Sequence, residues 1–185
     1  MIMKLPQEVI LDTNIPIISN KNVADVSNDE LHRWEVCIDI INHVTDNGIL
    51  VIDSSGEIIL EYKKNLNFSG APGLGDRFFK WVFDNQFSSS LIKRVDVAKN
   101  DEDYVNFPKD ENLSKFDKSD MKFVALSNTS SPPTAIVEAS DGKWWKWSKI
   151  LKKYSIDVLF VDEAIAKKGC RKKNRCGDKN CDECI

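Results

Sequence analysis

Hydrophobic and polar positions alternate along the chain in blocks that predict strands and helices in turn. Short apolar runs between turn residues predict buried strands, at residues 9–11, 49–52, 91–97, 134–138 and 156–161. Apolar residues three or four positions apart predict amphipathic helices, at residues 28–46, 54–66, 76–87, 119–128 and 142–154. This alternation predicts an α/β fold, a three-layer α/β/α sandwich with a central, mostly parallel sheet.

One long polar segment interrupts the alternation. Residues 98–119 are rich in acids and lie between a predicted strand and a predicted helix. Long excursions in compact domains often serve as lids or specificity loops. We therefore expect this segment to shape access to whatever site the sheet carries.

Composition is that of a soluble globular protein. The chain has 185 residues, of which 42% are hydrophobic and 30% charged, and a net charge of −3. No apolar run reaches the length of a membrane span, and Pro6, Gln7 and Glu8 interrupt any signal-peptide pattern. We expect a cytoplasmic protein that does not associate with membranes.

The C-terminal end differs from the rest of the chain. Residues 167–185 hold seven basic and three acidic residues, so this tail carries +4 and the remainder −7. Such a split suggests a basic, interacting end. We divide the chain into a main domain at 1–166 and a basic, cysteine-rich tail at 167–185.

Four of the five cysteines lie in this tail, at Cys170, Cys176, Cys181 and Cys184. Four thiolates can form a tetrahedral zinc site, although only the last pair has the usual two-residue spacing. Disulfides or free thiols are the alternatives. A zinc knuckle would present a basic surface to RNA, DNA or a partner protein, formed by Arg171, Lys172, Lys173 and Arg175.

Four carboxylates follow apolar strands or occupy helix starts: Asp12, Glu61, Asp120 and Asp141. Each has an ordinary alternative role: Asp12 as a helix cap, Glu61 as a solvated helix residue, Asp120 as a first-turn acid and Asp141 as a turn residue. Parallel strands would bring them to one sheet edge, where open α/β sheets bind ligands. With no obvious cationic partners, such a cluster calls for a hard divalent cation.

The residues around these acids resemble the PIN-domain nucleases, a family of small α/β proteins that includes many toxin ribonucleases and RNA-processing enzymes. The resemblance covers about residues 8–162. It depends on Asp12-Thr13-Asn14 after a strand, the helix carrying Glu61-Tyr62, Asp117-Lys118-Ser119-Asp120 at a helix start, and the strand leading to Asp141 with Trp144-Trp145 after it.

The resemblance implies that Asp12, Glu61, Asp120 and Asp141 bind one or two Mg²⁺ or Mn²⁺ ions. It makes Asn14 a secondary contact that orients Asp12 or a metal-bound water. Two departures stand out. Glu138 precedes Asp141 and could replace or assist it, and the excursion at 98–119 is longer than in the smallest members.

Several residues near these acids suit nucleic acid. Lys143 and Lys146 flank Trp145, which either stacks on a base or packs on the surface. Lys63 and Lys64 are further candidate phosphate contacts, although charge runs are usually solvated faces.

The first functional hypothesis is a Mg²⁺- or Mn²⁺-dependent endonuclease, with RNA favoured over DNA, in a toxin-like or defence role. Its expected partners are nucleic acid, an inhibitor protein and a second copy of the chain. The alternative is a catalytically inactive PIN-like module that binds nucleic acid or protein through the cysteine-rich tail. A divalent-metal phosphohydrolase acting on small molecules also stays open.

Overall fold

A parallel sheet forms the centre of the computed structural model, which describes residues 3–68, 73–101 and 103–173. The five strands run in the order β3-β2-β1-β6-β7 and all neighbours pair in parallel. Their bounds are β1 Glu8–Leu11, β2 Ile49–Asp53, β3 Ile92–Val95, β6 Ala135–Glu138 and β7 Val158–Phe160. The prediction of an α/β fold on a parallel sheet is confirmed.

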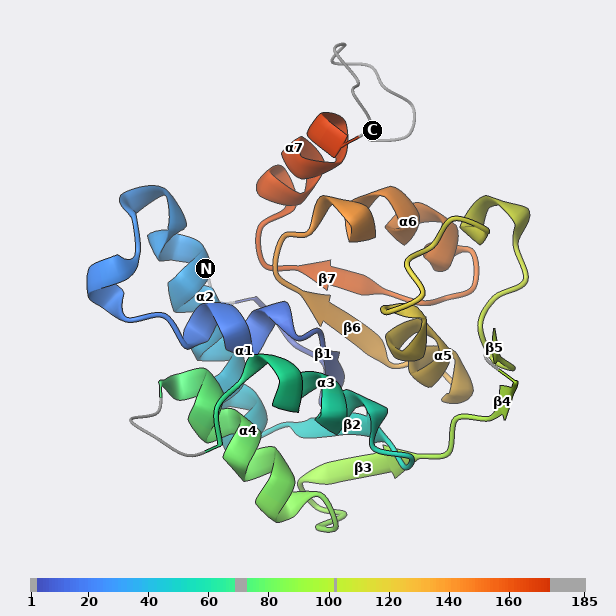
Figure 1. Ribbon diagram of the computed structural model, residues 1–185, viewed down its shortest axis with the longest axis horizontal. Coiled ribbons are helices and arrows are strands. Elements are labelled where there is room, and N and C mark those ends of the chain that lie inside the picture. Colours follow the sequence, from blue (N-terminus) through green and yellow to red (C-terminus); the bar gives the residue numbers. More distant parts are fainter. Residues whose placement is uncertain (1–2, 69–72, 102, 174–185) are drawn as a thin grey trace.

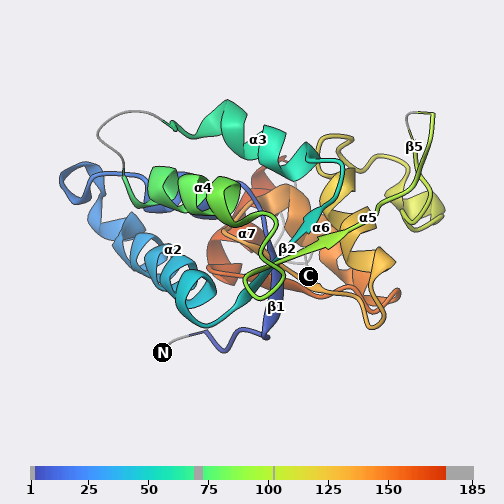
Figure 2. The same ribbon diagram turned by 90° about the horizontal axis from the view of Figure 1, so that it is seen from below.

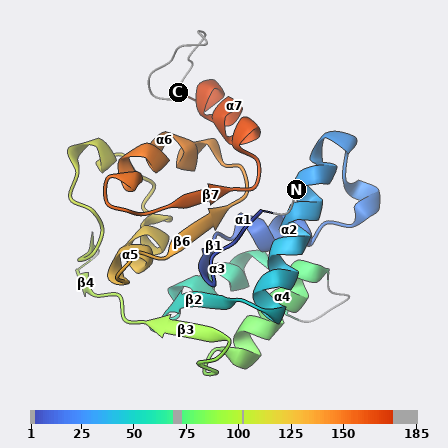
Figure 3. The ribbon, with the colours of Figure 1, turned by 180° about the vertical axis from the view of Figure 1, so that it is seen from behind.

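Two groups of helices pack against this sheet (Figure 1). Helices α1, α2, α3 and α4 pack on one another near β1, β2 and β3, whereas α5, α6 and α7 lie near β6 and β7 (Figure 3). This arrangement is consistent with a three-layer sandwich. The bounds are α1 Asn14–Ser19, α2 Asn28–Asp46, α3 Glu57–Asn65, α4 Leu74–Asn85, α5 Met121–Thr129, α6 Gly142–Lys152 and α7 Glu163–Lys173.

The strands are buried because helices cover the sheet. Ile10, Leu50 and Ile136 on three adjacent strands have no exposed surface. A parallel sheet covered in this way has continuous apolar strands rather than alternating ones, which is why short apolar runs located them. Cys37 of α2 and Trp144 of α6 belong to the same core, as their helical spacing predicts.

The start of α3 differs from the prediction. Ser54 and Glu57 have the spacing of a capping box, but the helix begins at Glu57. The carboxylate of Asp53, the last residue of β2, accepts hydrogen bonds from the backbone N–H groups of Glu57 at 2.7 Å and Ile58 at 2.8 Å. A strand residue thus satisfies the first turn of the helix, a role that a search for local caps does not find.

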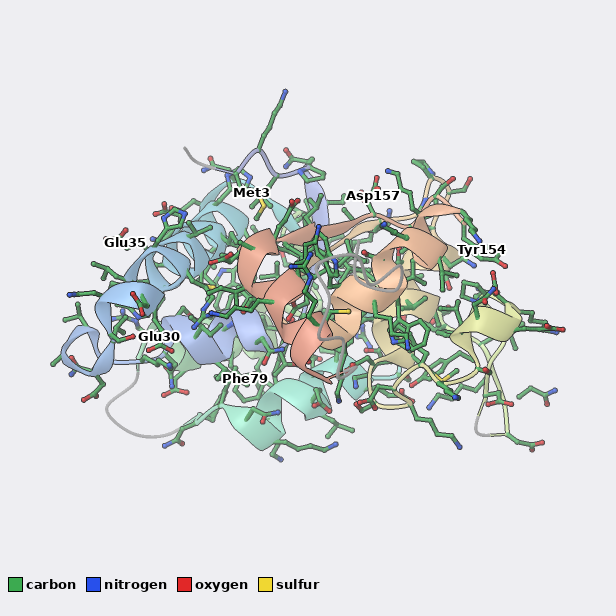
Figure 4. The ribbon with its side chains drawn as sticks, turned by 90° about the horizontal axis from the view of Figure 1, so that it is seen from above. Met3, Glu30, Glu35, Phe79, Tyr154 and Asp157 are labelled. Atoms are coloured by element: carbon green, nitrogen blue, oxygen red, sulfur yellow. The ribbon has the colours of Figure 1, made fainter. Side chains whose placement is uncertain are left out.

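The excursion at 98–119 has structure of its own. It contains the antiparallel pair β4 Lys99–Asn100 and β5 Asp103–Tyr104, and the short 3₁₀ helix η2 Glu111–Leu113. The pair projects from the body of the molecule beyond α5 (Figure 2). Tyr154 at the end of α6 donates a hydrogen bond to Asp110 at 3.3 Å, which anchors the segment before η2 (Figure 4).

Helix α7 continues across the boundary that the sequence placed between residues 166 and 167. Ala166 and Cys170 are buried, and α7 packs closely on α6. The sequence did not predict this helix. Within the described ranges, no helix is both long and apolar enough to cross a membrane.

Gly142, the first residue of α6, permits this close packing. A Cβ atom at Gly142 would lie 2.2 Å from the backbone nitrogen of Cys170, whereas one at Gly169 would meet α6 at an ordinary 3.4 Å. Gly142→Ala should therefore lower the free energy of unfolding by about 1–3 kcal/mol, because backbone atoms must move apart. Urea denaturation measures this change.

Gly169→Ala is the matched control. Alanine is the better helix former, so this variant should keep or gain up to about 1 kcal/mol. Equal losses in the two variants would contradict the packing argument.

Candidate active site

The acidic residues gather where β1 and β6 lie side by side. From β1 the chain proceeds to β2 and β3 on one side of the sheet, and from β6 it proceeds to β7 on the other. The connections after these two strands therefore diverge, and such a switch point leaves a crevice at the carboxyl ends of the strands. Asp12 and Glu138 lie at this edge: Leu11 pairs with Val137, and Asp12 N donates to Val137 O at 2.9 Å.

Asn14 connects the carboxylates of the two strands. Its backbone N–H donates to Asp12 Oδ1 at 2.9 Å, and its side-chain amide donates to Glu138 Oε1 at 3.2 Å. The other oxygen of Glu138 accepts the backbone N–H of Asp141 at 2.7 Å. Asn14 thus fixes Asp12, and Glu138 fixes the turn that carries Asp141.

Asp120 and Asp141 are half-buried at the starts of α5 and α6. Asp141 Oδ1 accepts the backbone N–H of Lys143 at 2.9 Å, so its expected role in the turn is real. Asp120 precedes the first residue of α5 without a side-chain cap bond. The negative charges of both residues raise the pKa of Asp12, so these acids share one electrostatic environment.

Burial makes ionisation of this cluster costly. Asp12 is 3% exposed and Glu138 is fully buried. Desolvation raises the pKa of both carboxyls, and each raises that of the other. Burial also raises the pKa of Asp120 to about 6, assisted by the charge of Asp117. At neutral pH the pair Asp12 and Glu138 therefore carries less than its full negative charge.

Glu61 lies on α3, across the site from β6. The neighbouring Tyr62 is fully buried and donates its hydroxyl to Leu11 O at 2.7 Å, which places α3 beside the end of β1. Glu61 Oε2 lies 3.4 Å from Lys64 Nζ and 3.6 Å from Lys122 Nζ. No charge effect of Glu61 on Asp12 or Asp120 is among the causes of their pKa shifts.

The expectation that the acids lack cationic partners is wrong. Besides the two lysines at Glu61, Lys143 pairs with Asp117 at 2.5 Å. This ion pair holds the pKa of Asp117 at about 2, and the charges of Asp141 and Asp120 help to raise the pKa of Lys143. Positive charge therefore lies on both sides of the acidic cluster, contributed by α3 and α5 on one side and α6 on the other.

A groove of about 570 Å³ adjoins Glu61. Helix α3 forms one wall, and the excursion and the start of α5 form the other. Glu57 ties the walls together because it accepts hydrogen bonds from Lys99 and from Tyr104. The lysines that line it are Lys63, Lys64, Lys118 and Lys122.

The remaining candidates lie apart from this groove. Trp145 packs against Phe160 of β7, with ring centroids 5.3 Å apart, which is the surface-packing alternative. Lys146 lies over the ring of Trp147 at 4.8 Å. In α7, Cys170 is buried and Arg171 is partly buried. Lys172 and Lys173 belong to the same helix, whereas Arg175, Cys176, Cys181 and Cys184 lie outside the described residues.

The carboxylates fit a divalent ion by chemistry more than by present spacing. Within the part of the chain that the structure describes, no group of three or more His, Cys, Asp or Glu side chains is arranged to hold a metal ion. The donors nevertheless include buried oxygens that repel one another, which suits Mg²⁺ or Mn²⁺. Thr13 Oγ1, next to Asp12, is also buried without a hydrogen-bond partner among the described residues.

Sequence reasoning noted Glu138 only as a departure, yet it is the most buried acid at this edge. Its signal was a glutamate at the end of a continuous apolar strand. Lys122 was missed, because a lysine in an amphipathic helix is usually solvated.

Comparisons of the chain with protein-family models, with curated proteins and with solved structures find no match.

The raised pKa values predict how stability depends on pH. Asp12, Glu138 and Asp120 have pKa values of about 7, 8 and 6 when folded, so the folded chain binds more protons than the unfolded chain between about pH 4 and pH 8. Their stabilising effect is complete below about pH 4 and is lost as the pH rises to 8. The melting temperature of metal-free protein should therefore fall across this window.

Asp12→Asn should flatten this fall, because it removes one of the coupled acids. Asp46→Asn changes an exposed residue at the end of α2 and is the matched control, expected to follow the wild type. Thermal denaturation by circular dichroism in EDTA gives the comparison. A wild-type melting temperature that rises steadily from pH 5 to pH 8 would be inconsistent with these pKa values.

Proposed function

We propose that the protein is a metal-dependent endonuclease of PIN type that hydrolyses phosphodiester bonds in RNA. The observation that carries the proposal is the placement of Asp12, Asp120 and Asp141 in one electrostatic environment at the carboxyl edge of a parallel sheet. These residues come from three segments far apart in the sequence. Buried like charges are unfavourable by themselves, so a divalent ion is the partner that best accounts for them.

Asp12, Asp120 and Asp141 would hold this ion, with Glu61 at the margin of the site. An ion bound there would supply the activation of water and the neutralisation of phosphate charge that phosphodiester hydrolysis needs. Asn14 keeps Asp12 oriented through the 2.9 Å bond to its carboxylate. Glu138 holds Asp141 in place through the backbone bond at 2.7 Å.

The groove beside Glu61 supports a nucleic acid as the substrate. Its lysines can contact successive phosphates, and Tyr104 offers an aromatic face at the opposite wall. The volume of about 570 Å³ suits a single strand rather than the full width of a duplex. RNA is favoured over DNA by the resemblance to PIN-type ribonucleases alone.

Asp12→Asn should reduce Mn²⁺-dependent cleavage by at least about 100-fold, because the most buried of the three ligands loses its charge. The assay incubates labelled single-stranded RNA, single-stranded DNA and duplex DNA with Mn²⁺, Mg²⁺ or EDTA. Asp46→Asn should cleave like the wild type. Circular dichroism checks that both variants fold.

Full activity in Asp12→Asn would refute the proposed site. Absence of cleavage by wild-type protein on every substrate, with RNA binding retained, would instead favour the non-catalytic binding module.

Charge reversal in the groove tests the path of the strand. The double variant Lys63→Glu, Lys118→Glu should weaken binding of a single-stranded oligonucleotide by at least about tenfold, and should lower the salt dependence by about 1.4 in log–log slope for two lost phosphate contacts. Fluorescence anisotropy in EDTA measures binding without cleavage. Lys80→Glu with Lys93→Glu changes the net charge equally on α4 and β3, outside the groove, and should leave more of the affinity intact.

A further inference from the structure

Lys122 places a positive charge among the acids, largely out of contact with water. The residue is 8% exposed. Its ammonium donates to the backbone carbonyl of Ser119, lies 3.6 Å from Glu61 Oε2 and lies 4.8 Å from the ring centroid of Phe123. Contacts from α3, from α5 and from the turn before α5 therefore fix its position.

The charge of Lys122 reaches several of the acids. It acts to lower the pKa of Asp12 and of Asp120, besides pairing with Glu61. Lys64 also pairs with Glu61, but its side chain is 72% exposed, so water and salt screen its charge. Lys122 is thus the buried cation that Asp12, Asp120 and Glu61 have in common.

This position conflicts with a second metal ion. A divalent ion bound by Glu61 would lie near a fixed ammonium that solvent screens poorly, and their repulsion would be strong. Glu61 would also have to leave a partly buried ion pair, which leaves Lys122 without its carboxylate. Asp12, Asp120 and Asp141 are subject to no such competition for a direct ion-pair partner among the ion pairs of the described residues.

We infer that Lys122 acts as a resident cation that takes Glu61 out of the ligand set, so that the site holds one divalent ion on Asp12, Asp120 and Asp141. The inference rests on the proposed function, because it presupposes that these acids bind metal. It assigns Glu61 a different role from that implied by the resemblance: Glu61 positions Lys122 at the boundary between the acids and the groove. Lys122 itself is a positioning residue, since its ammonium acts on the carboxylates.

Isothermal titration calorimetry with Mn²⁺, in the absence of nucleic acid, tests the inference directly. Wild-type protein should bind one ion per chain. Lys122→Met keeps the apolar stem and removes the charge, so it should bind two ions. Adding Glu61→Gln to Lys122→Met should restore one ion, because the released carboxylate is lost again.

Lys64→Met is the matched control, since it removes the exposed partner of Glu61 and leaves Lys122 in place. It should bind one ion. Circular dichroism establishes that each variant is folded. Should Lys122→Met fail to fold, two further variants keep the test decisive: Glu61→Gln should change Mn²⁺ affinity less than about threefold, whereas Asp120→Asn should reduce it at least about tenfold.

The outcomes separate the inference from the proposed function. Two ions in the wild type, or one ion in folded Lys122→Met, would overturn the role of Lys122 and leave a metal-dependent nuclease standing. A large loss of affinity in Glu61→Gln would do the same. No Mn²⁺ binding by the wild type would overturn the proposed function, and the inference with it.

Discussion

Two carboxylates of like charge, Asp12 and Glu138, are buried next to each other at the ends of adjacent strands, and much of the surrounding structure compensates for that cost. Backbone N–H groups of Asn14 and Asp141 hold one oxygen of each. The side chain of Asn14 joins the two strand ends through Glu138. Such bonds lower the energy of the ionised forms but do not offset their desolvation, since the pKa of each remains raised.

The topology of the sheet determines which residues meet this constraint. Because β1 and β6 are neighbours while their connections lead to opposite sides, Asp12 and Asp141 arrive at one edge from segments about 130 positions apart. Tyr62 adds α3 to the same edge by bonding to Leu11 O. Metal binding, if it follows, depends on a geometry that the core of the sheet enforces.

Much of the fold could be predicted from the sequence, because buried parallel strands are continuous apolar runs and α2 has regular helical spacing. Two features could not. The cap of α3 comes from Asp53, which belongs to a strand and is identified only when its contacts are known. Helix α7 has few apolar positions among many basic ones, so its sequence resembles a solvated tail although Ala166 and Cys170 are buried.

The candidate site was predictable in its members more than in their electrostatics. Strand ends and helix starts identified Asp12, Asp120 and Asp141, because the carboxyl ends of parallel strands converge. The partner of Glu61 was not predictable, because a lysine two positions after Asp120 gives no local sign of pointing toward α3. Whether an acid stands beside a cation or another acid depends on packing between helices.

The contact between Gly142 and the backbone of α7 has a mechanical consequence. Gly142 directly follows Asp141, and the backbone of residues 169 and 170 rests against it with no room for a side chain between them. Side chains absorb small displacements by changing rotamer, whereas two touching backbones transmit them. Any force applied to the end of α7 is therefore passed rigidly to the first turn of α6, and so to the residue that presents Asp141.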